Sequence, residues 1–294
     1  MESPFSCIHC KSVLRIDTAN RLKCCACRWE CARHDEYWDF EPETIQFPTL
    51  DWRLKASYRD ICLGRGSRDA WGSAAAESFG ASDLHGDQLR VVSAHRPDQP
   101  SVILDISGGS GLQLSKLCAL EATVIHWEAH IPSLREAQTR YAAKGLPVWV
   151  CRGSYLQPHV RSNSIDLLVC FDTLERGELH DVFLLRTIRR LLKEGGIALV
   201  DYHCRGTTNH SVRVYEDWEI CDYLARSGLR LRYRESIGYG PTTRFSSSRI
   251  GWGAAKAYAR LVRRPSRRIV VVEKGPDLVE SVTEDFTLFE RGVD

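Results

Sequence analysis

The stretch VILDISGGSG, residues 102–111, decides the fold that we expect for this chain. An apolar run with one carboxylate, Asp105, is followed by three glycines in four positions. This pattern is typical of a buried strand that ends in a ligand-binding loop, because glycine adopts positive φ and lets the backbone approach a ligand closely. Ser107 stands where one more glycine is expected.

The rest of the chain after residue 100 alternates between apolar strands and amphipathic helices. The predicted strands are 123–128, 148–151, 165–171, 197–202 and 267–275. The predicted helices are 132–145, 181–196 and 214–228, the last with Val214, Trp218, Cys221 and Ala225 on its buried face. Val-, Ile- and Leu-rich strands that alternate with helices predict an α/β, doubly wound sheet, mostly parallel and covered on both faces.

Composition narrows the class of protein. The chain has 294 residues, 43% of them hydrophobic, and a net charge of +2. Its net charge therefore argues neither for nor against a polyanionic binding partner. No run approaches 18 apolar residues, and the first ten residues lack the features of a signal peptide. We therefore expect a cytoplasmic protein with no membrane partner, whose 12 cysteines are thiols or metal ligands.

Three regions are predicted. Residues 1–45 contain five of the 12 cysteines and form one unit, 46–100 form a helical N-terminal segment, and 101–294 form the main domain. An insertion around 237–266 is rich in basic and aromatic side chains and lacks acidic ones. We interpret it as an amphipathic lid over the substrate pocket, with RNA binding as the alternative.

The N-terminal cysteines occur as two C-x-x-C pairs, Cys7 with Cys10 and Cys24 with Cys27, separated by thirteen residues. Each pair directs two thiolates to one metal, and four thiolates are the ligand set of a closed tetrahedral Zn²⁺ site. The spacing predicts a zinc ribbon with a hairpin that turns near 18–20 and a returning strand over 28–40. Other nearby donors are Cys25, Cys31, His9 and His34.

An acid at the end of the second strand, Glu128, is placed to face the glycine loop. There it can accept hydrogen bonds from two ribose hydroxyls. A dinucleotide fingerprint starting at Gly109 lacks its third glycine, so the pair predicts another adenosine-containing ligand.

Four segments together resemble the successive motifs of class I S-adenosylmethionine-dependent methyltransferases, over roughly residues 70–275. They are VILDISGGSG, VIHWEAH, SIDLLVCFDTLER and LLKEGGIALVDY. The resemblance implies a Rossmann-like sheet of seven strands, the last antiparallel, with S-adenosylmethionine across the strand ends.

The resemblance also implies which residues contact the cofactor. Those at the methionyl end are Asp105, Ser107, Gly109 and Gly111; Glu128 binds the ribose; Ala129, His130 and Ser154 lie near the adenine; and Phe171 and Asp172 close the pocket after the fourth strand. Two of these depart from the family pattern. Ser107 replaces the first glycine of G-x-G-x-G, and Ser154 replaces an aspartate.

Candidate catalytic groups are few. His203 follows the fifth strand, and Asp172 and His180 lie in or beside the loop after the fourth, so each is placed near the cofactor. We predict His203 and Asp172 as the catalytic residues, with His203 as general base.

The function predicted is methyl transfer to a small-molecule nucleophile, such as a secondary metabolite or a sugar. The N-terminal segment resembles the zinc ribbon of ribosomal RNA guanine methyltransferases, so an RNA base methyltransferase is the alternative. A methyltransferase-like protein with a non-methylating role is the third hypothesis. The ribbon is also a candidate surface for pairing two copies into a homodimer.

Overall fold

The computed structural model describes most of the chain outside three long stretches, 41–80, 238–266 and 276–294. The described residues are 2–34, 37–40, 81–112, 114, 122–155, 157–174, 181–204, 214–237 and 267–275. Most of the predicted helical segment, nearly all of the predicted basic lid, and His180 lie outside these ranges. Among the described residues, no helix is long and apolar enough to span a membrane.

The elements follow the predicted alternation closely. The strands are β1 Glu2–Ser6, β2 Val13–Ile16, β3 Leu22–Cys24, β4 Ala32–His34, β5 Tyr37–Asp39, β6 Val102–Ile106, β7 Thr123–Glu128, β8 Val148–Arg152, β9 Ile165–Cys170, β10 Leu192–His203, β11 Leu229–Ile237 and β12 Arg267–Lys274. The helices are α2 Ala81–His95, α4 Ile131–Ala143, α5 Asp181–Leu191 and α6 Asp217–Arg226.

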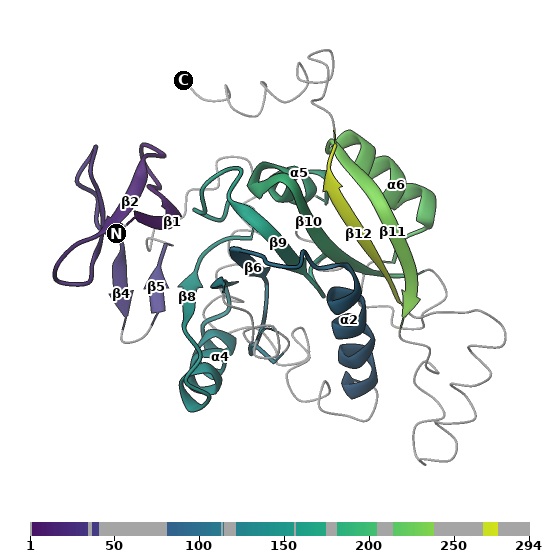
Figure 1. Ribbon diagram of the computed structural model, residues 1–294, viewed down its shortest axis with the longest axis horizontal. Coiled ribbons are helices and arrows are strands. Elements are labelled where there is room, and N and C mark those ends of the chain that lie inside the picture. The colour runs from purple at the N-terminus through teal and green to yellow at the C-terminus, as the bar shows by residue number, and fades with distance from the viewer. Residues whose placement is uncertain are drawn as a thin grey trace, which may run out of the picture.

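The central sheet has the order β11-β12-β10-β9-β6-β7-β8-β5-β4 (Figure 1). Strands β10, β9, β6, β7 and β8 run parallel, and β12 is antiparallel to both of its neighbours, as the resemblance implied. The expectation of seven strands is incomplete, because the described residues contribute nine strands to this sheet. The two additional strands, β5 and β4, come from the N-terminal cysteine-rich region.

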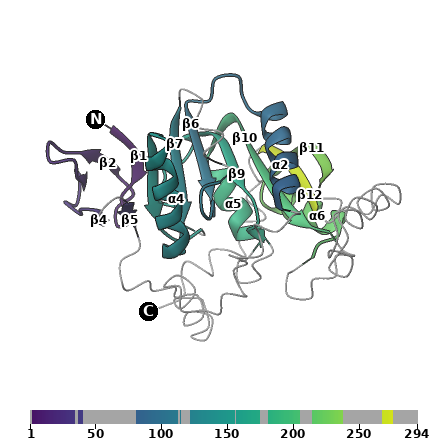
Figure 2. The same cartoon turned by 90° about the horizontal axis from the view of Figure 1, so that it is seen from below.

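Helices cover both faces of the sheet, α2 and α4 on one and α5 and α6 on the other (Figures 1 and 2). Side chains of each strand alternate between the two layers. On β6, Ile103 packs with the core of the first face and Leu104 with that of the second. The same alternation decides which charged residues share a face at the strand ends.

Helix α6 presents a different face to the core from the one predicted. Ile220 and Leu224 are buried, whereas Cys221 is exposed and Trp218 is 70% exposed. The helix begins at Asp217, after the N-cap Glu216, so Val214 lies before it. The prediction followed the aromatic and cysteine positions, but the aliphatic pair at i and i+4 is the one that packs.

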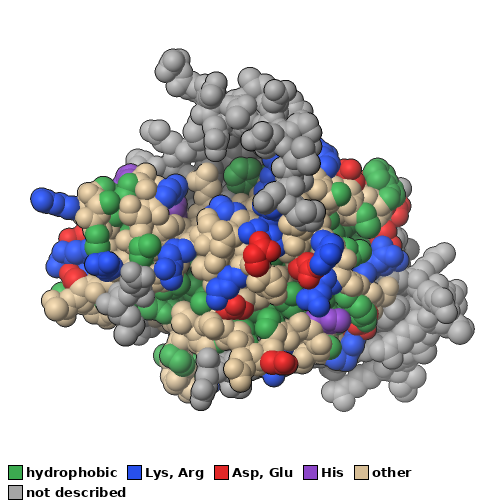
Figure 3. Space-filling view, turned by 45° about the horizontal axis from the view of Figure 1, so that its top comes forward, with side chains coloured by type: hydrophobic (Ala, Val, Ile, Leu, Met, Phe, Trp, Pro, Cys, Tyr) green, Lys and Arg blue, Asp and Glu red, His purple; other side chains and the backbone are tan. Residues whose placement is uncertain are grey.

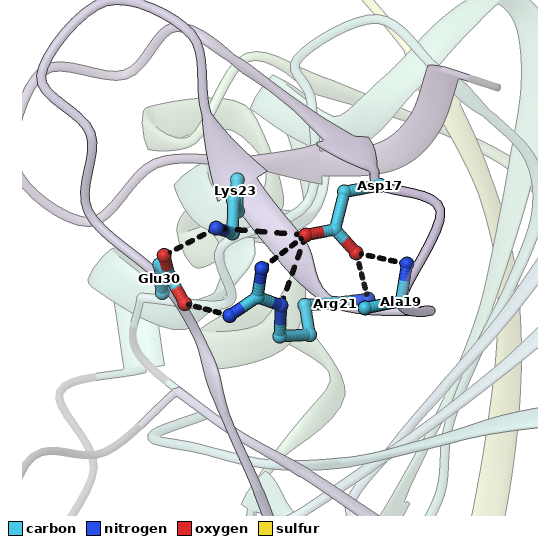
Figure 4. A network of polar contacts seen from close by, with 5 residues as sticks. All are labelled: Asp17, Ala19, Arg21, Lys23 and Glu30. Atoms are coloured by element: carbon cyan, nitrogen blue, oxygen red, sulfur yellow. Dashed lines mark hydrogen bonds and ion pairs between the residues drawn. The ribbon is translucent and has the colours of Figure 1, made fainter.

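The N-terminal cysteine-rich region, called the ribbon below, contains among its described residues a three-stranded sheet, β1-β2-β3, whose hairpin turns where the sequence predicted. Oδ1 of Asp17 accepts hydrogen bonds from the backbone N–H groups of Ala19 and Arg21, both at 2.9 Å. Arg21 and Lys23 bridge Asp17 to Glu30 (Figure 4). These exposed ion pairs add little stability, but the Asp17 backbone bonds define the turn.

The ribbon shares a hydrophobic core with the central sheet. The fully buried Phe5 packs on Phe40 and Trp149, with ring centroids 5.0 and 5.4 Å apart. Phe40 in turn packs on Trp127 of β7, at 5.1 Å. The predicted returning strand over 28–40 is therefore wrong in part. These residues form β4 and β5, and β5 pairs with β8 because its aromatic side chains bury against that edge.

Candidate functional site

The glycine loop leaves the C-terminal end of β6, at the edge where parallel strands present ligand sites. The N–H of Ser107 donates to the carbonyl of Trp127 at 2.8 Å, which extends the β6–β7 ladder by one residue. Gly109 and Gly111 have φ of +54° and +73°. The loop therefore curves back over the ends of β6 and β7.

Position 108 requires glycine for a steric reason. A Cβ at this position would lie 2.3 Å from Oδ2 of Asp105 and 2.6 Å from Nδ1 of His126. A Cβ at Gly111 would lie 2.3 Å from the hydroxyl of Tyr141. The loop thus rests directly on a buried polar floor made by Asp105, His126 and Tyr141.

The floor is electrostatically unusual. Burial, and then the nearby Glu128 charge, raise the pKa of Asp105 to about 8. Burial lowers the pKa of His126 to about 4, so its ring is neutral at physiological pH. Nδ1 of His126 lies 3.0 Å from the hydroxyl of Tyr141 and 3.9 Å from Oδ2 of Asp105. Asp105 is therefore protonated near pH 7 in the ligand-free protein, ready to ionise beside a cation.

Ser107 adopts the left-handed backbone conformation that a glycine would take, with φ +64°. For a non-glycine residue this costs on the order of 1–2 kcal/mol. Its side chain is buried, and its Oγ has no hydrogen-bond partner among the described residues; the same holds for Oδ2 of Asp105. Two buried, unsatisfied polar atoms beside a strained loop residue are the pattern expected of a site that awaits a polar ligand.

Glu128 ends β7 opposite the loop and is already well bonded. Its Oε2 accepts from the N–H of Gly109 at 2.9 Å, and its Oε1 accepts from the N–H of His130 at 2.8 Å. The hydroxyl of Tyr155 also donates to Oε1. A carboxylate has about four lone-pair positions, so these three bonds leave room for one further donor.

The remaining predicted cofactor residues lie around this edge. Ala129, Ser154 and Phe171 are buried, and Ala129 donates its N–H to the hydroxyl of Tyr155 at 3.4 Å. The carbonyl of Ser154 accepts from the indole N–H of Trp127 at 3.1 Å. The structure therefore places Ser154 beside Trp127 of β7.

Asp172 and His203 meet through a residue that the sequence did not single out. Arg267, at the start of β12, pairs with Asp172 and with the fully buried Asp201. Its Nη2 lies 2.5 Å from Nε2 of His203. Burial raises the pKa of Asp201 to about 6, while the Arg267 charge opposes that rise. Arg267 thus lies at the centre of a charged cluster on the α2/α4 face.

The two pairs of cysteines converge as predicted. The Sγ atoms of Cys7, Cys10, Cys24 and Cys27 all lie within 4.8 Å of one another. Each pair forms the same turn: the N–H of Lys11 donates to the carbonyl of Cys7, and that of Arg28 to the carbonyl of Cys24, both at 3.1 Å. Lys11 and Arg28 both have positive φ. This repeated geometry fits four thiolates to one tetrahedral metal ion.

Three other candidate donors, Cys25, Cys31 and His34, are not part of the cluster. Cys25 is exposed and outside the cluster, and the buried Cys31 donates its S–H to the carbonyl of Asp39 at 3.3 Å. Nε2 of His34 pairs with the carboxylate of Asp39 at 3.3 Å. The matched spacing of the two pairs was therefore the right guide to the cluster.

Sequence reasoning missed Tyr155, His126, Tyr141 and Arg267. Tyr155, Tyr141 and Arg267 lie outside the four quoted motifs and reach the site by folding, whereas His126 lies within VIHWEAH. The one available signal was that His126 interrupts an otherwise apolar strand two residues before Glu128.

Comparison with known proteins agrees with this geometry. Residues 103–196 match the model of a family described as a methyltransferase domain. This is the segment that carries the glycine loop, Glu128 and strand β9. The chain has a methyltransferase-like fold. A search of curated proteins finds no match.

Solved structures share the fold at low sequence identity. A chain from the complex between the Haloferax volcanii Trm112 methyltransferase activator and a putative methyltransferase is 16% identical, with a TM-score of 0.55 over 73% of this chain and 100% of that one. An S-adenosylmethionine-dependent methyltransferase from Leishmania major is 19% identical, with a TM-score of 0.54 over 74% and 82%. Geranyl diphosphate C-methyltransferase from Streptomyces coelicolor A3(2) is 15% identical, with a TM-score of 0.53 over 71% and 88%.

Proposed function

We propose that this protein is an S-adenosylmethionine-dependent methyltransferase that acts on a small-molecule nucleophile. The observation that carries the proposal is the pair of buried, unsatisfied atoms beside the glycine loop, Oγ of Ser107 and Oδ2 of Asp105. A buried polar atom without a partner costs on the order of 1–3 kcal/mol. The ammonium and carboxylate groups of a methionyl moiety match this pair, one as donor to Asp105 and the other as acceptor from Ser107.

The adenosine half has a matching acid. Glu128 lies one strand away from Asp105 on the same face, and its free acceptor position on Oε2 suits a ribose hydroxyl. When bound, S-adenosylmethionine supplies a methyl group activated by a positively charged sulfur. The chain then has to hold the acceptor in line with that carbon and take the acceptor's proton. His203 and Asp172 are the proposed groups on that side of the site.

The small-molecule preference is supported by charge. RNA affinity depends chiefly on contacts to phosphates, and this chain has a net charge of only +2. The methyltransferase of the same fold from Streptomyces coelicolor has a small-molecule substrate, geranyl diphosphate. RNA remains the alternative because the ribbon exposes basic side chains (Figure 3): Lys11, Arg15, Arg21, Arg28 and Arg33.

We also propose that Cys7, Cys10, Cys24 and Cys27 bind one structural Zn²⁺. The cluster is closed, with four donors and two matching turns, which is the arrangement of structural rather than catalytic zinc. The ribbon has three short strands, and a bound metal compensates for so small a core.

Calorimetry with S-adenosylhomocysteine tests the cofactor proposal. Wild-type protein should bind it with micromolar affinity. Ser107→Ala removes only the hydroxyl and should weaken binding about tenfold or more, as expected for a hydrogen bond to a charged group. Ser107→Gly should weaken binding similarly while stabilising the free protein, because it relieves the positive φ. No binding at millimolar concentration would instead favour the non-methylating hypothesis.

The acceptor class needs a separate experiment. Protein and methyl-labelled S-adenosylmethionine can be incubated with purified total RNA and, separately, with a protein-free extract of small molecules. Label that enters the extract supports the proposal. Label that enters RNA alone would replace it with the RNA alternative.

A further inference from the structure

Arg267 is the feature of the acceptor side that most needs an explanation. Its side chain is 9% exposed, and its partner Asp201 is fully buried. Nη1 of Arg267 lies 2.8 Å from Oδ2 of Asp201, and Nε2 of Gln88 donates to the same oxygen at 2.7 Å. Burying such a pair gains little stability over apolar residues of the same size. A positional role accounts for its presence better than a stabilising one.

The first group that Arg267 positions is Asp172. This residue follows β9 with φ +53°, a strained value for a non-glycine residue. Its N–H donates to Oδ1 of Asp201 at 2.8 Å, and its carboxylate pairs with Arg267. The Arg267–Asp201 pair therefore holds both the backbone and the carboxylate of Asp172, whose side chain is 44% exposed and so within reach of a ligand.

The second group is His203. A guanidinium is only a donor, so the 2.5 Å contact between Nη2 of Arg267 and Nε2 of His203 makes Nε2 the acceptor. The ring is then neutral, with its proton on Nδ1. Nε2 cannot take a proton from a substrate while Arg267 occupies its lone pair.

The position of Arg267 follows from sheet geometry. On β12 side chains alternate between faces, and the antiparallel register places His203 opposite Arg267 and Tyr202 opposite Arg268. Arg267 therefore points to the α2/α4 face, with Asp201 and His203. Arg268 points to the other face and pairs there with Asp217 of α6. Two adjacent arginines thus have separate partners.

We propose that Arg267 is the positioning residue of the acceptor side. It fixes Asp172 in its strained conformation and His203 in the Nδ1–H tautomer. The expected effect of Arg267 on reaction rate rests on the proposed function, whereas the arrangement of Asp172 and His203 around Arg267 does not. This arrangement revises the assignment of His203 as general base, because Nδ1 then carries the ring proton and Arg267 holds the lone pair of Nε2.

The first test is the tautomer of His203 in wild-type protein, read from ¹⁵N chemical shifts of the imidazole nitrogens and assigned by comparison with His203→Gln. The expected result is a neutral ring protonated on Nδ1. A ring protonated on Nε2, or a doubly protonated ring at pH 7, would overturn the proposal whether or not the protein transfers methyl groups.

The second test compares Arg267→Lys with Arg268→Lys. Lysine keeps the charge beside Asp201, but its ammonium is a compact point charge without the planar fork of a guanidinium, so it cannot reproduce the geometry that joins Asp201, Asp172 and His203. Arg267→Lys should release the His203 tautomer and lower kcat about tenfold or more, with the affinity for S-adenosylhomocysteine changed less than about threefold. Arg268→Lys should change neither. An unchanged tautomer in Arg267→Lys, or equal effects of the two variants, would contradict the proposal.

Discussion

The hydroxyl of Tyr155 donates a hydrogen bond to Oε1 of Glu128, and both side chains are buried. With the N–H groups of His130 and Gly109, this bond leaves the carboxylate one position for a ligand donor. The acid expected to bind two ribose hydroxyls is therefore arranged for one. The difference arises because Tyr155 reaches Glu128 from the end of the neighbouring strand β8, a contact that no sequence spacing reveals.

Deoxy analogues of S-adenosylhomocysteine should expose this arrangement. Wild-type protein should lose about tenfold or more in affinity for one of the 2′-deoxy and 3′-deoxy compounds and change little for the other, because a hydrogen bond to a charged group is worth about 1.5–3 kcal/mol. Tyr155→Phe vacates a position on Oε1 and should make binding sensitive to both. Equal losses for the two analogues in wild-type protein would show that Glu128 binds both hydroxyls.

Asp105 should make cofactor binding depend on pH. Its folded pKa of about 8 means that it holds a proton at pH 7 in the free protein. A ligand ammonium favours the ionised form, so binding should release a proton, and affinity should rise as the pH increases from 6 to 8. Calorimetry at pH 7 in buffers of different ionisation enthalpy measures the release. Asp105→Asn should bind more weakly and release no proton. If the wild-type protein also releases no proton, Asp105 is not the group that ionises on binding.

The same group predicts a trend in the stability of the free protein. The pKa of an unfolded aspartate is about 3.9, below the folded value, so the native state binds more protons between about pH 4 and 8. The contribution of Asp105 to the free energy of unfolding therefore falls as pH rises through this range. Urea unfolding at pH 5 and pH 8 should show a smaller loss of stability in Asp105→Asn than in wild type. An equal loss in both would mean that Asp105 is ionised already at pH 5.

Two exposed cysteines provide a matched test of the metal cluster. Cys10 lies in the cluster and Cys25 lies outside it, although both are exposed. Cys25→Ser should retain about one zinc per chain after dialysis, while Cys10→Ser should lose most of it and melt at a lower temperature. Zinc measured by elemental analysis distinguishes the two. Equal zinc content in both variants would exclude Cys10 as a ligand.

Phe40 connects the ribbon to strand β7 of the central sheet. Its ring contacts Phe5 of β1 and Trp127, the residue before Glu128. Phe40→Ala should lower the free energy of unfolding by about 3–5 kcal/mol, the usual cost of removing a buried aromatic ring. Phe40→Leu should cost less. Denaturant unfolding measures both, and a cost below about 1 kcal/mol for the alanine variant would show that the ribbon packs loosely on the sheet.

Much of the fold was predictable because its signals are local. Strands β6, β7 and β9 are apolar runs with clear ends, and proline and glycine delimit α4. Val182, Leu185 and Ile188 of α5 are buried at helical spacing. The predicted helix over 181–196 is wrong at its end, because α5 ends at Leu191 and Leu192 begins β10. The face of α6 was predicted wrongly because Trp218 and Cys221 read as apolar in sequence although they remain in solvent.

The additional strands β4 and β5 illustrate a second limit. Their residues follow the last cysteine pair directly, so a ribbon strand was the local interpretation. In the structure the side chains of Tyr37 and Trp38 are buried, and β5 pairs with β8. Burial against a distant edge decided their place, and short strands have too little local preference to oppose it.

The sequence by itself determined the α/β alternation, the glycine loop with Asp105 and Glu128 at adjacent strand ends, and the four clustered cysteines. These depend on periodicity and on fixed spacing along the chain. Tertiary structure alone decided how these groups are held: Tyr155 on Glu128, His126 and Tyr141 beneath the loop, and Arg267 between Asp172 and His203. Such contacts join residues up to 95 positions apart (Arg267 minus Asp172), and their geometry comes from strand order and register, which no local pattern encodes.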